Sequence, residues 1–284
     1  MKDYEPLKNL WRCAFSDKEQ YIDYYFQNKA GISRIYTDKE NGTLVSMAFF
    51  TPYTVRLFQK RVTAYYIVGV ATEEKYRGAH RMTRLLQDAM TELKDSLLFL
   101  CPENPAVYTS LGFQPIYWQT PLLIGPDYHA RPLHGTICRW ESLKNKQAVI
   151  DFANTVLAQE MFDLYIERSV MYYNQVAAEL RALNGNLLTI CDDTGNISAI
   201  VNLICEEGQY EITELITRPE YGAGIMSLLL KNLPTDSMKI DDSHFLSQLH
   251  RTDIVCEHFK KPYIMCKMPQ NKLENINCYI NDIT

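Results

Sequence analysis

The sequence predicts a mixed α/β fold built from two units in tandem. Helical patterns of apolar residues alternate with runs of strand-forming residues, which is typical of helices packed on sheets. The order of helices, antiparallel strands and crossover helix occurs twice, on either side of a turn-rich segment at 125–135. The length of 284 residues suits about two domains of ordinary size. We therefore expect one unit over residues 1–130 and a second over 131–284.

The first unit is expected to open with two short helices between residues 4 and 28. Ser16 and Glu19 have the spacing of a capping box and separate the two helices. The Asn41-Gly42 pair predicts a hairpin turn, and Asn104 predicts a helix cap. Strands are predicted at 32–37, 43–51, 53–58, 61–72, 96–101 and 113–124, and helices at 80–95 and 104–111.

The second unit is expected to repeat this order with little sequence identity. Its predicted helices lie near 143–159, 164–183 and 222–233, and its strands at 186–191, 196–205 and 209–217. The DDTGN run at 192–196 predicts a turn between two of these strands. Gly222 and Gly224 open the last helix, and we interpret this lone GxG as a helix start rather than as a cofactor loop.

Composition and charge exclude several classes of protein. With 46% hydrophobic and 22% charged residues, the chain is neither disordered nor collagen-like. Its net charge of −5 argues against a nucleic-acid partner. We see no secretory signal and no apolar run of the roughly 18–20 residues that span a bilayer, so we expect a cytoplasmic protein without a membrane partner.

The eight cysteines are scattered without a CxxC pair, so we expect buried free thiols. No compact zinc spacing joins the histidines and cysteines of the tail, and we expect no metal there. These tail residues are His244, His250, Cys256, His258 and Cys266.

The most informative segment is 70–86, where a buried strand enters a turn and the turn opens a helix. Free N–H groups and the positive end of the dipole at a helix start suit a pyrophosphate. Arg77 and Arg81 add positive charge close to that end. The alternative is an ordinary strand-to-helix corner with a solvated basic face, and physical arguments alone do not separate the two.

This segment resembles the acetyl-CoA-binding motif of the GCN5-related N-acetyltransferases (GNATs), Arg/Gln-x-x-Gly-x-Gly/Ala. Arg77 matches the leading Arg, whereas His80 stands where the family has its most characteristic Gly, and Met82 replaces a Gly or Ala. About 30 residues further on, the run from Tyr108 to Phe113 (YTSLGF) resembles the second signature of the family, Tyr-x-x-x-Gly-Phe.

The tandem layout is similar to that of the Eis (enhanced intracellular survival) acetyltransferases. In these proteins a catalytic GNAT unit precedes a degenerate one, and a third, sterol-carrier-like domain follows. The segment Lys261–Lys267 resembles the closing strand of their second unit. We expect two GNAT-like units here, each a mixed, mostly antiparallel sheet with flanking helices. The second unit is expected to be degenerate, and the third domain to be missing.

The resemblance implies an acetyl-CoA-dependent N-acetyltransferase. An amine of a small cationic molecule or of a lysine side chain would attack the thioester directly. Tyr108 would act as general acid, because a phenol can donate to a leaving thiolate. The residues implied to contact acetyl-CoA are Val70, Ala71, Thr72, Arg77, Gly78, Ala79, His80, Arg81, Met82, Thr83, Glu103 and Asn104.

Several points stay open. The stretch Asp23-Tyr24-Tyr25-Phe26 is either an acceptor site for a cationic amine or a helix face packed on the sheet. Because His80 replaces a Gly, a non-catalytic binding or regulatory protein is the alternative function. Aminoacyl transfer from a charged tRNA is a third interpretation, which the net charge disfavours. The sequence leaves open which amine is the acceptor, which group is the general base and whether the chain forms a homo-oligomer.

Overall fold

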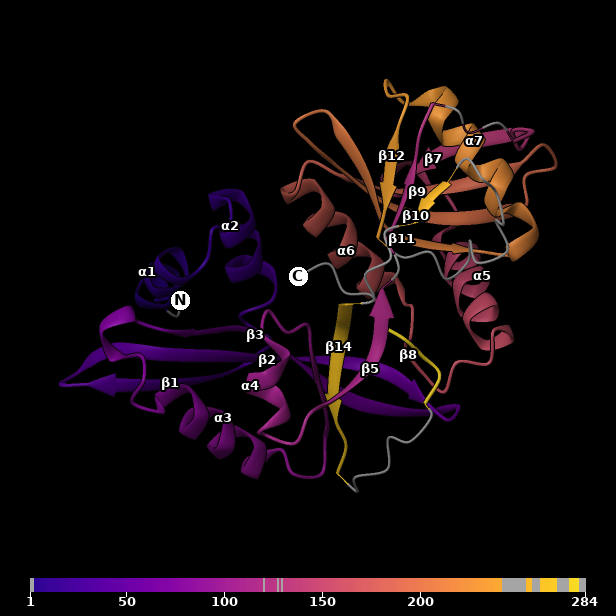
Figure 1. Cartoon of the computed structure of the whole chain (residues 1–284). Helices are drawn as coiled ribbons and strands as arrows, with labels where there is room; N and C mark the ends of the chain where they lie inside the picture. Colours follow the sequence, from indigo (N-terminus) through magenta and orange to yellow (C-terminus); the bar gives the residue numbers. More distant parts are fainter. Residues whose placement is uncertain are drawn as a thin grey trace.

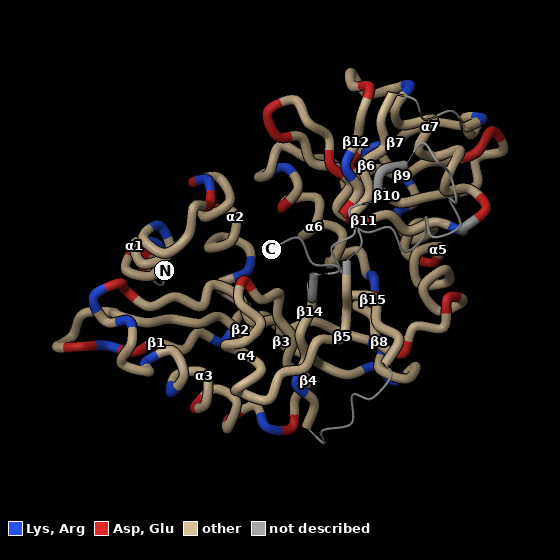
Figure 2. Tube along the Cα trace, viewed as in Figure 1, with Lys and Arg blue, Asp and Glu red and all other residues tan. Residues whose placement is uncertain are grey.

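The computed structural model describes residues 3–119, 121–126, 128, 130–241, 254–256, 261–269 and 276–280. Its strands form two mixed sheets, and helices flank each of them (Figure 1). The mixed α/β class with two units is thus confirmed. Figure 2 shows charges of both signs distributed over both units.

The observed elements follow the predicted order. The helices are α1 (Glu5–Ala14), α2 (Glu19–Asn28), α3 (Arg81–Glu92), α4 (Pro105–Thr109), α5 (Lys146–Gln159), α6 (Val170–Ala182) and α7 (Gly222–Asn232). Single 3₁₀ turns are η1 (Glu74–Tyr76), η2 (Trp140–Ser142) and η3 (Pro219–Tyr221). The strands of the first sheet are β1 (Arg34–Glu40), β2 (Thr43–Leu57), β3 (Lys60–Thr72), β4 (Leu97–Leu100), β5 (Gln114–Gln119), β8 (Leu164–Ile166), β14 (Lys261–Lys267) and β15 (Cys278–Tyr279). Those of the second are β6 (Leu122–Ile124), β7 (Gly135–Arg139), β9 (Asn186–Asp192), β10 (Ile197–Glu206), β11 (Gln209–Thr217), β12 (Met238–Ile240) and β13 (Ile254–Cys256).

The two sheets are built alike. In the first, the meander β1–β2–β3 is followed by α3, and β4 returns parallel to β3. In the second, the meander β9–β10–β11 is followed by α7, and β12 returns parallel to β11. The predicted hairpin turn between β1 and β2 is confirmed, since Asn41 and Gly42 have φ values of 49° and 82°.

The two sheets also exchange a strand. Strand β14, from the end of the chain, lies between β4 and β5 of the first sheet. Strand β6, from the first half, lies at the equivalent place between β12 and β13 of the second sheet. The expectation that Lys261–Lys267 closes the second unit is therefore wrong. Strands cross the expected boundary at residue 130 in both directions, and the division into domains of residues 1–130 and 131–284 stays a prediction.

Two local expectations are also wrong. Helix α2 begins after Lys18 without a side-chain cap, so Ser16 and Glu19 form no capping box. Residues 164–166 form strand β8 on the edge of β2 instead of the start of a helix. Helix α6 begins only after Ser169, whose hydroxyl accepts a hydrogen bond from the Tyr172 N–H (3.1 Å).

The described cysteines are free, but most of them are not buried. Cys266 and Cys278 are buried, Cys13 is exposed, and the others are half-buried. The expectation of buried thiols thus holds for two strand positions and fails elsewhere. His244, His250 and His258 lie outside the described residues, and so does the side chain of Cys256. The remainder of the described chain contains no cluster of potential metal ligands.

Two apolar layers cover the first sheet. Helix α3 buries Leu85, Leu86 and Ala89 against one face. Helices α1 and α2 lie on the other face (Figure 1), where Trp11 contacts the ring of Phe49 with centroids 5.7 Å apart. Fully burying such a side chain stabilises the fold by about 1.5–3 kcal/mol. Helices thus cover both faces of the first sheet, and the ends of its strands are not covered by these packed faces.

Candidate functional site

Strand β3 separates from β4 where the site begins. The parallel pairing of these strands includes Tyr66 opposite Phe99 and goes no further in the described structure. On its other edge β3 has a bulge, because Gly69 and Val70 together face one residue of β2. Gly69 has a φ of +60°, and a Cβ there would lie 2.5 Å from the Trp11 ring. The strand therefore needs glycine at the bulge.

The turn after β3 leads to the start of α3. Gly78 has a φ of +80° and open space where a side chain would project. His80 is the N-cap of α3 and has left-handed backbone angles (φ 56°, ψ 21°). Glycine adopts this conformation most easily. The family motif has glycine at this position, and His80 takes the same left-handed backbone here. The first N–H groups of α3 have no partner within the helix and suit an anion.

A cleft of about 510 Å³ lies at this corner. Most of the predicted cofactor residues line it, namely Val70, Ala71, Thr72, Arg77, Gly78, His80, Arg81, Met82, Thr83 and Glu103. Ala79 and Asn104 are not among the lining residues. Asn104 instead caps α4, where its side-chain oxygen accepts a hydrogen bond from the Ala106 N–H (3.1 Å). Contact of any of these residues with a cofactor stays a prediction.

The two arginines of the corner are held differently. Arg77 is exposed, and its Nε donates to the Thr72 carbonyl (3.2 Å). Arg81 forms ion pairs with Asp38 (2.8 Å) and with Glu40 on β1, which raise the pKa of its guanidinium. Its charge is thus largely offset by carboxylates. The backbone of α3 and Arg77 are the groups left to attract an anion.

A second cavity, of about 300 Å³, continues from the cleft. Phe15, Val70 and Glu103 line both spaces. The cavity extends between the end of α1 and the separated strands β3 and β4. Its other lining residues are Trp11, Asp17, Tyr21, Tyr66, Ile67, Val68, Gly69, Cys101, Tyr108 and Leu183. The cleft at the helix start and the cavity therefore adjoin each other.

Tyr108 lies on α4 and lines this cavity. Its ring packs edge-on against Phe113, with centroids 6.0 Å apart. Burial, followed by the nearby Glu103 and Cys101, raises the pKa of Tyr108 to about 12. At neutral pH the phenol is therefore protonated and able to donate a hydrogen bond into the cavity.

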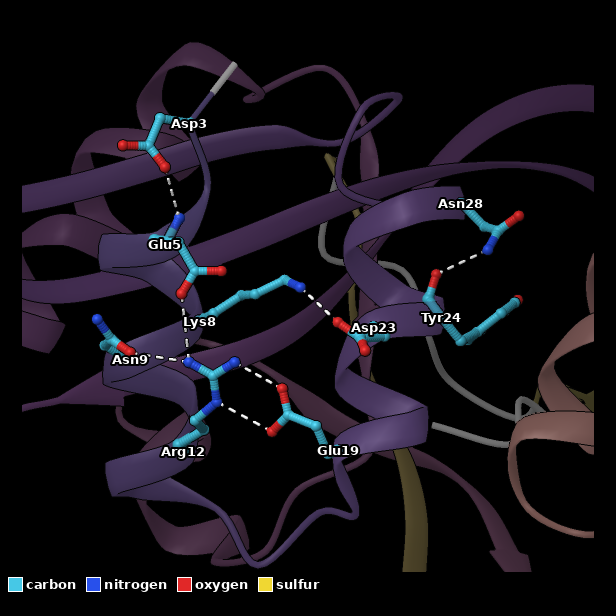
Figure 3. A network of polar contacts seen from close by, with 9 residues as sticks. All are labelled: Asp3, Glu5, Lys8, Asn9, Arg12, Glu19, Asp23, Tyr24 and Asn28. Atoms are coloured by element: carbon cyan, nitrogen blue, oxygen red, sulfur yellow. Dashed lines mark hydrogen bonds and ion pairs between the residues drawn. The ribbon is translucent and has the colours of Figure 1, made fainter. Parts of the chain in front are cut away.

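The aromatic, acidic stretch of α2 does not line the cavity. Tyr24, Tyr25 and Phe26 are buried in the core, and Trp11 contacts the last two rings. Asp23 forms an ion pair with Lys8 of α1 (2.5 Å; Figure 3). Of the two interpretations of this stretch, the structure favours the packed helix face.

The sequence did not predict the cavity wall that Asp17, Tyr21 and Leu183 form. Asp17 lies between α1 and α2, and its Oδ2 accepts a hydrogen bond from Trp11 Nε1 (2.7 Å). Tyr21 comes from α2, and Leu183 follows α6 of the second unit. No motif marks these positions. The only signal for Asp17 is its place in the break between two predicted helices.

A polar network fixes this break. Arg12 of α1 donates to both carboxylate oxygens of Glu19 on α2, at 2.5 and 3.0 Å, and to Asn9 at 2.8 Å (Figure 3). Glu19 raises the pKa of Arg12, so the guanidinium keeps its charge. The bidentate pair ties α1 to α2 on either side of Asp17.

The equivalent corner of the second unit is partly filled by the chain itself, beside a surface pocket of about 680 Å³ that Ala223 and Gly224 also line. The Leu133 N–H donates to the Gly224 carbonyl (3.0 Å), and the Ser227 hydroxyl donates to the Ala130 carbonyl (2.8 Å). A Cβ on Gly224 would lie 3.1 Å from the Leu133 nitrogen. The segment before β7 thus lies against the start of α7, and Gly224 serves this close approach.

The sequence of residues 1–116 matches the acetyltransferase (GNAT) domain family. These matched residues, the GNAT domain, contain both the corner after β3 and Tyr108. No curated protein matches the chain in sequence.

Solved structures share the fold beyond the GNAT domain. A probable N-acyltransferase from Enterococcus faecalis is 18% identical, with a TM-score of 0.73 over 95% of this chain and 71% of that one. Eis1 from Mycobacterium abscessus is 11% identical, with a TM-score of 0.65 over 95% and 72%. N-myristoyltransferase from Saccharomyces cerevisiae, with bound myristoyl-CoA, is 11% identical, with a TM-score of 0.51 over 83% and 72%. The Eis-like resemblance thus extends over both units. Within the described residues, no helix has the length and apolarity to cross a membrane.

Proposed function

We propose that the protein transfers the acetyl group of acetyl-CoA to a primary amine of a small cationic molecule or of a lysine side chain. The path along the adjoining cleft and cavity, from the start of α3 to Tyr108, supports this proposal. An acyl-CoA is long, carries a pyrophosphate and ends in a thioester. The path offers it an anion site at one end and a proton donor at the other.

In the proposed complex the pyrophosphate meets the first turn of α3, with Arg77 beside it. The pantetheine chain lies along the edge of β3 that β4 leaves open, where backbone groups of Val70 and Thr72 face its amides. This places the thioester near the bulge and Tyr108. Preorganised N–H groups at the bulge stabilise the oxyanion of the tetrahedral intermediate.

The reaction forms a bond between the amine nitrogen and the thioester carbonyl carbon, and the bond from that carbon to sulfur breaks. Tyr108 donates its phenolic hydrogen bond to the departing sulfur, which leaves as thiolate or thiol. The entering ammonium first gives one proton to water, which frees the lone pair that attacks, and the nitrogen gives a second proton to water as the intermediate collapses. Asp17, held by Trp11, offers the entering ammonium group a carboxylate.

Calorimetry with acetyl-CoA and with CoA tests the binding step, and thiol release in the presence of amines tests transfer. We expect saturable binding and amine-dependent release of CoA. Absence of binding at millimolar acetyl-CoA would contradict the proposal. Binding without transfer to any amine would favour the non-catalytic alternative.

Tyr108→Phe tests the proton donor. We expect kcat to fall by about 100-fold with unchanged affinity for acetyl-CoA. Tyr210→Phe, on β11 of the second unit, is the matched control and should leave kcat unchanged. If Tyr108→Phe retains full kcat, another group donates the proton.

The pH profile gives a separate test. Because the pKa of Tyr108 is raised to about 12, the phenol keeps its proton over the usual assay range. Its ionisation therefore causes no fall of kcat between pH 8 and about 10. A fall with a midpoint in this range that disappears in Tyr108→Phe would show that the pKa of the phenol is lower than the site suggests.

A further inference from the structure

Strand β14 reaches the catalytic sheet from the far end of the chain. It pairs with β4 through Met265, Cys266 and Lys267, and with β5 on its other edge. The pairing places Lys267 opposite Leu98 at the start of β4. The family match ends at residue 116, and β14 begins 145 residues later, at residue 261. The sheet of the GNAT domain thus includes a strand from outside the matched residues.

Lys267 contacts the turn that carries Tyr108. Its Nζ donates to the Leu111 carbonyl at 2.6 Å, and the side chain is partly buried. A Cβ on Gly112 would lie 3.2 Å from the same Nζ. Gly112 has a φ of +86°, so this position favours glycine both for its backbone and for the space that Lys267 occupies.

Backbone hydrogen bonds to Tyr108 hold the turn after α4 together. The Tyr108 carbonyl accepts hydrogen bonds from the Leu111 N–H (3.0 Å) and the Phe113 N–H (3.1 Å). The Gly112 N–H donates to the Thr109 carbonyl (3.0 Å). Helix α4 has only five residues, so it has little rigidity of its own. The ammonium on Leu111 adds a polar contact with β14 to the burial of Leu111 and Phe113 in the core, and it joins the end of this short helix to the sheet.

We propose that Lys267 is a positioning residue for Tyr108. Its ammonium fixes the turn after α4, and the turn fixes the direction in which the phenol enters the cavity. The last third of the chain thereby takes part in catalysis by the GNAT domain without touching the substrate. This inference rests on the proposed role of Tyr108 as proton donor.

The main test is a double-variant cycle with Lys267→Met, which keeps the length of the side chain and removes the donor. In the wild-type background we expect kcat to fall about tenfold with unchanged acetyl-CoA affinity, because a small misplacement of a reacting group is costly. In the Tyr108→Phe background the same change should lower kcat by less than about threefold. Lys267→Arg should restore most of the lost activity. Equal losses in both backgrounds, or no loss in either, would overturn the proposal.

Lys94→Met is the matched control. Lys94 lines the same surface groove as Lys267, next to α3 and β4, and none of the described hydrogen bonds joins it to the turn after α4. Its removal takes away the same charge and should leave kcat unchanged. A loss of kcat equal to that of Lys267→Met would show that the charge of the groove, and not the contact with Leu111, is responsible.

Amide hydrogen exchange provides a readout that does not need turnover. In Lys267→Met, the Gly112 and Phe113 amides should exchange at least about threefold faster, while amides of β3 stay as protected as before. This arm separates two failures. Unchanged exchange overturns the positioning role, whereas faster exchange in a protein without acetyl transfer rejects the proposed function and keeps the contact.

Discussion

The corner after β3 and the corner after β11 have the same topology, but a segment of the chain packs on the helix start only at the second. Each is a strand that ends a meander, a 3₁₀ turn and a crossover helix. After β3, Gly78 has open space around it and a cleft leads to Tyr108. After β11, residues of the segment before β7 are hydrogen bonded to the start of α7. The start of α3 thus lies at an open cleft, whereas part of the start of α7 is covered by the segment before β7.

This difference shows that the same fold can leave a helix start open or cover part of it with a neighbouring segment. A helix start needs partners for its free N–H groups, and a ligand or a neighbouring segment can provide an environment for them. The second unit also buries an ion pair against β11, between Arg168 and Glu214 (2.5 Å). Arg168 and Glu214 therefore serve the structure of the second unit, whereas Arg77 at the first corner is exposed.

The largest effect is expected from breaking the buried pair of the second unit. Arg168→Met leaves Glu214 without its guanidinium in a site where both side chains are almost fully buried. We expect the free energy of unfolding to fall by about 3–5 kcal/mol, measured by denaturant titration. Arg168→Met with Glu214→Leu should recover most of the loss. A single-variant loss below about 1 kcal/mol would contradict a structural role for this pair.

A smaller effect is expected from a carboxylate placed at the open corner. Thr83→Glu puts negative charge in the first turn of α3, which favours the helix but repels a pyrophosphate. We expect acetyl-CoA to bind about 100-fold more weakly, or about 2.7 kcal/mol, by calorimetry. Ala223→Glu makes the same change at the partly filled corner and should leave the affinity unchanged. Equal losses in both variants would remove the distinction between the corners.

Gly224→Ala tests the close packing of the partly filled corner. The added methyl group meets the backbone of Leu133 and Arg131, so the segment before β7 must move. We expect a loss of about 2 kcal/mol in unfolding free energy and no change in acetyl-CoA affinity. A neutral result in thermal unfolding would indicate that this segment is not tightly packed on α7.

The smallest effect is expected from His80→Gly at the open corner. Glycine removes the cost of the left-handed backbone, which is about 1–2 kcal/mol, and adds chain entropy to the unfolded state, which opposes part of that gain. We expect a net stabilisation of about 0.5 kcal/mol and an acetyl-CoA affinity within about threefold of the wild type. If the variant binds about 100-fold more tightly, His80 blocks the natural site, and the non-catalytic alternative becomes the better description.

Local patterns account for much of the agreement between sequence and structure. The Asn41-Gly42 turn and the Asn104 cap depend on backbone conformations that neighbouring residues decide. The same reasoning failed for β8, whose three residues are a strand only because β2 offers them an edge. It also failed for Arg81, whose charge is offset by Asp38 and Glu40, more than 40 residues earlier.

The sequence by itself determined the mixed α/β class, the order of the elements and the corner after β3, because periodicity and turn chemistry act over a few residues. Only the tertiary structure decided which strands share a sheet, that Asp17 and Leu183 line the cavity with Tyr108, and that Lys267 supports the turn after α4. These relations join residues that are far apart along the chain. They arise from the burial of apolar faces and the pairing of strand edges, which no short segment of sequence specifies.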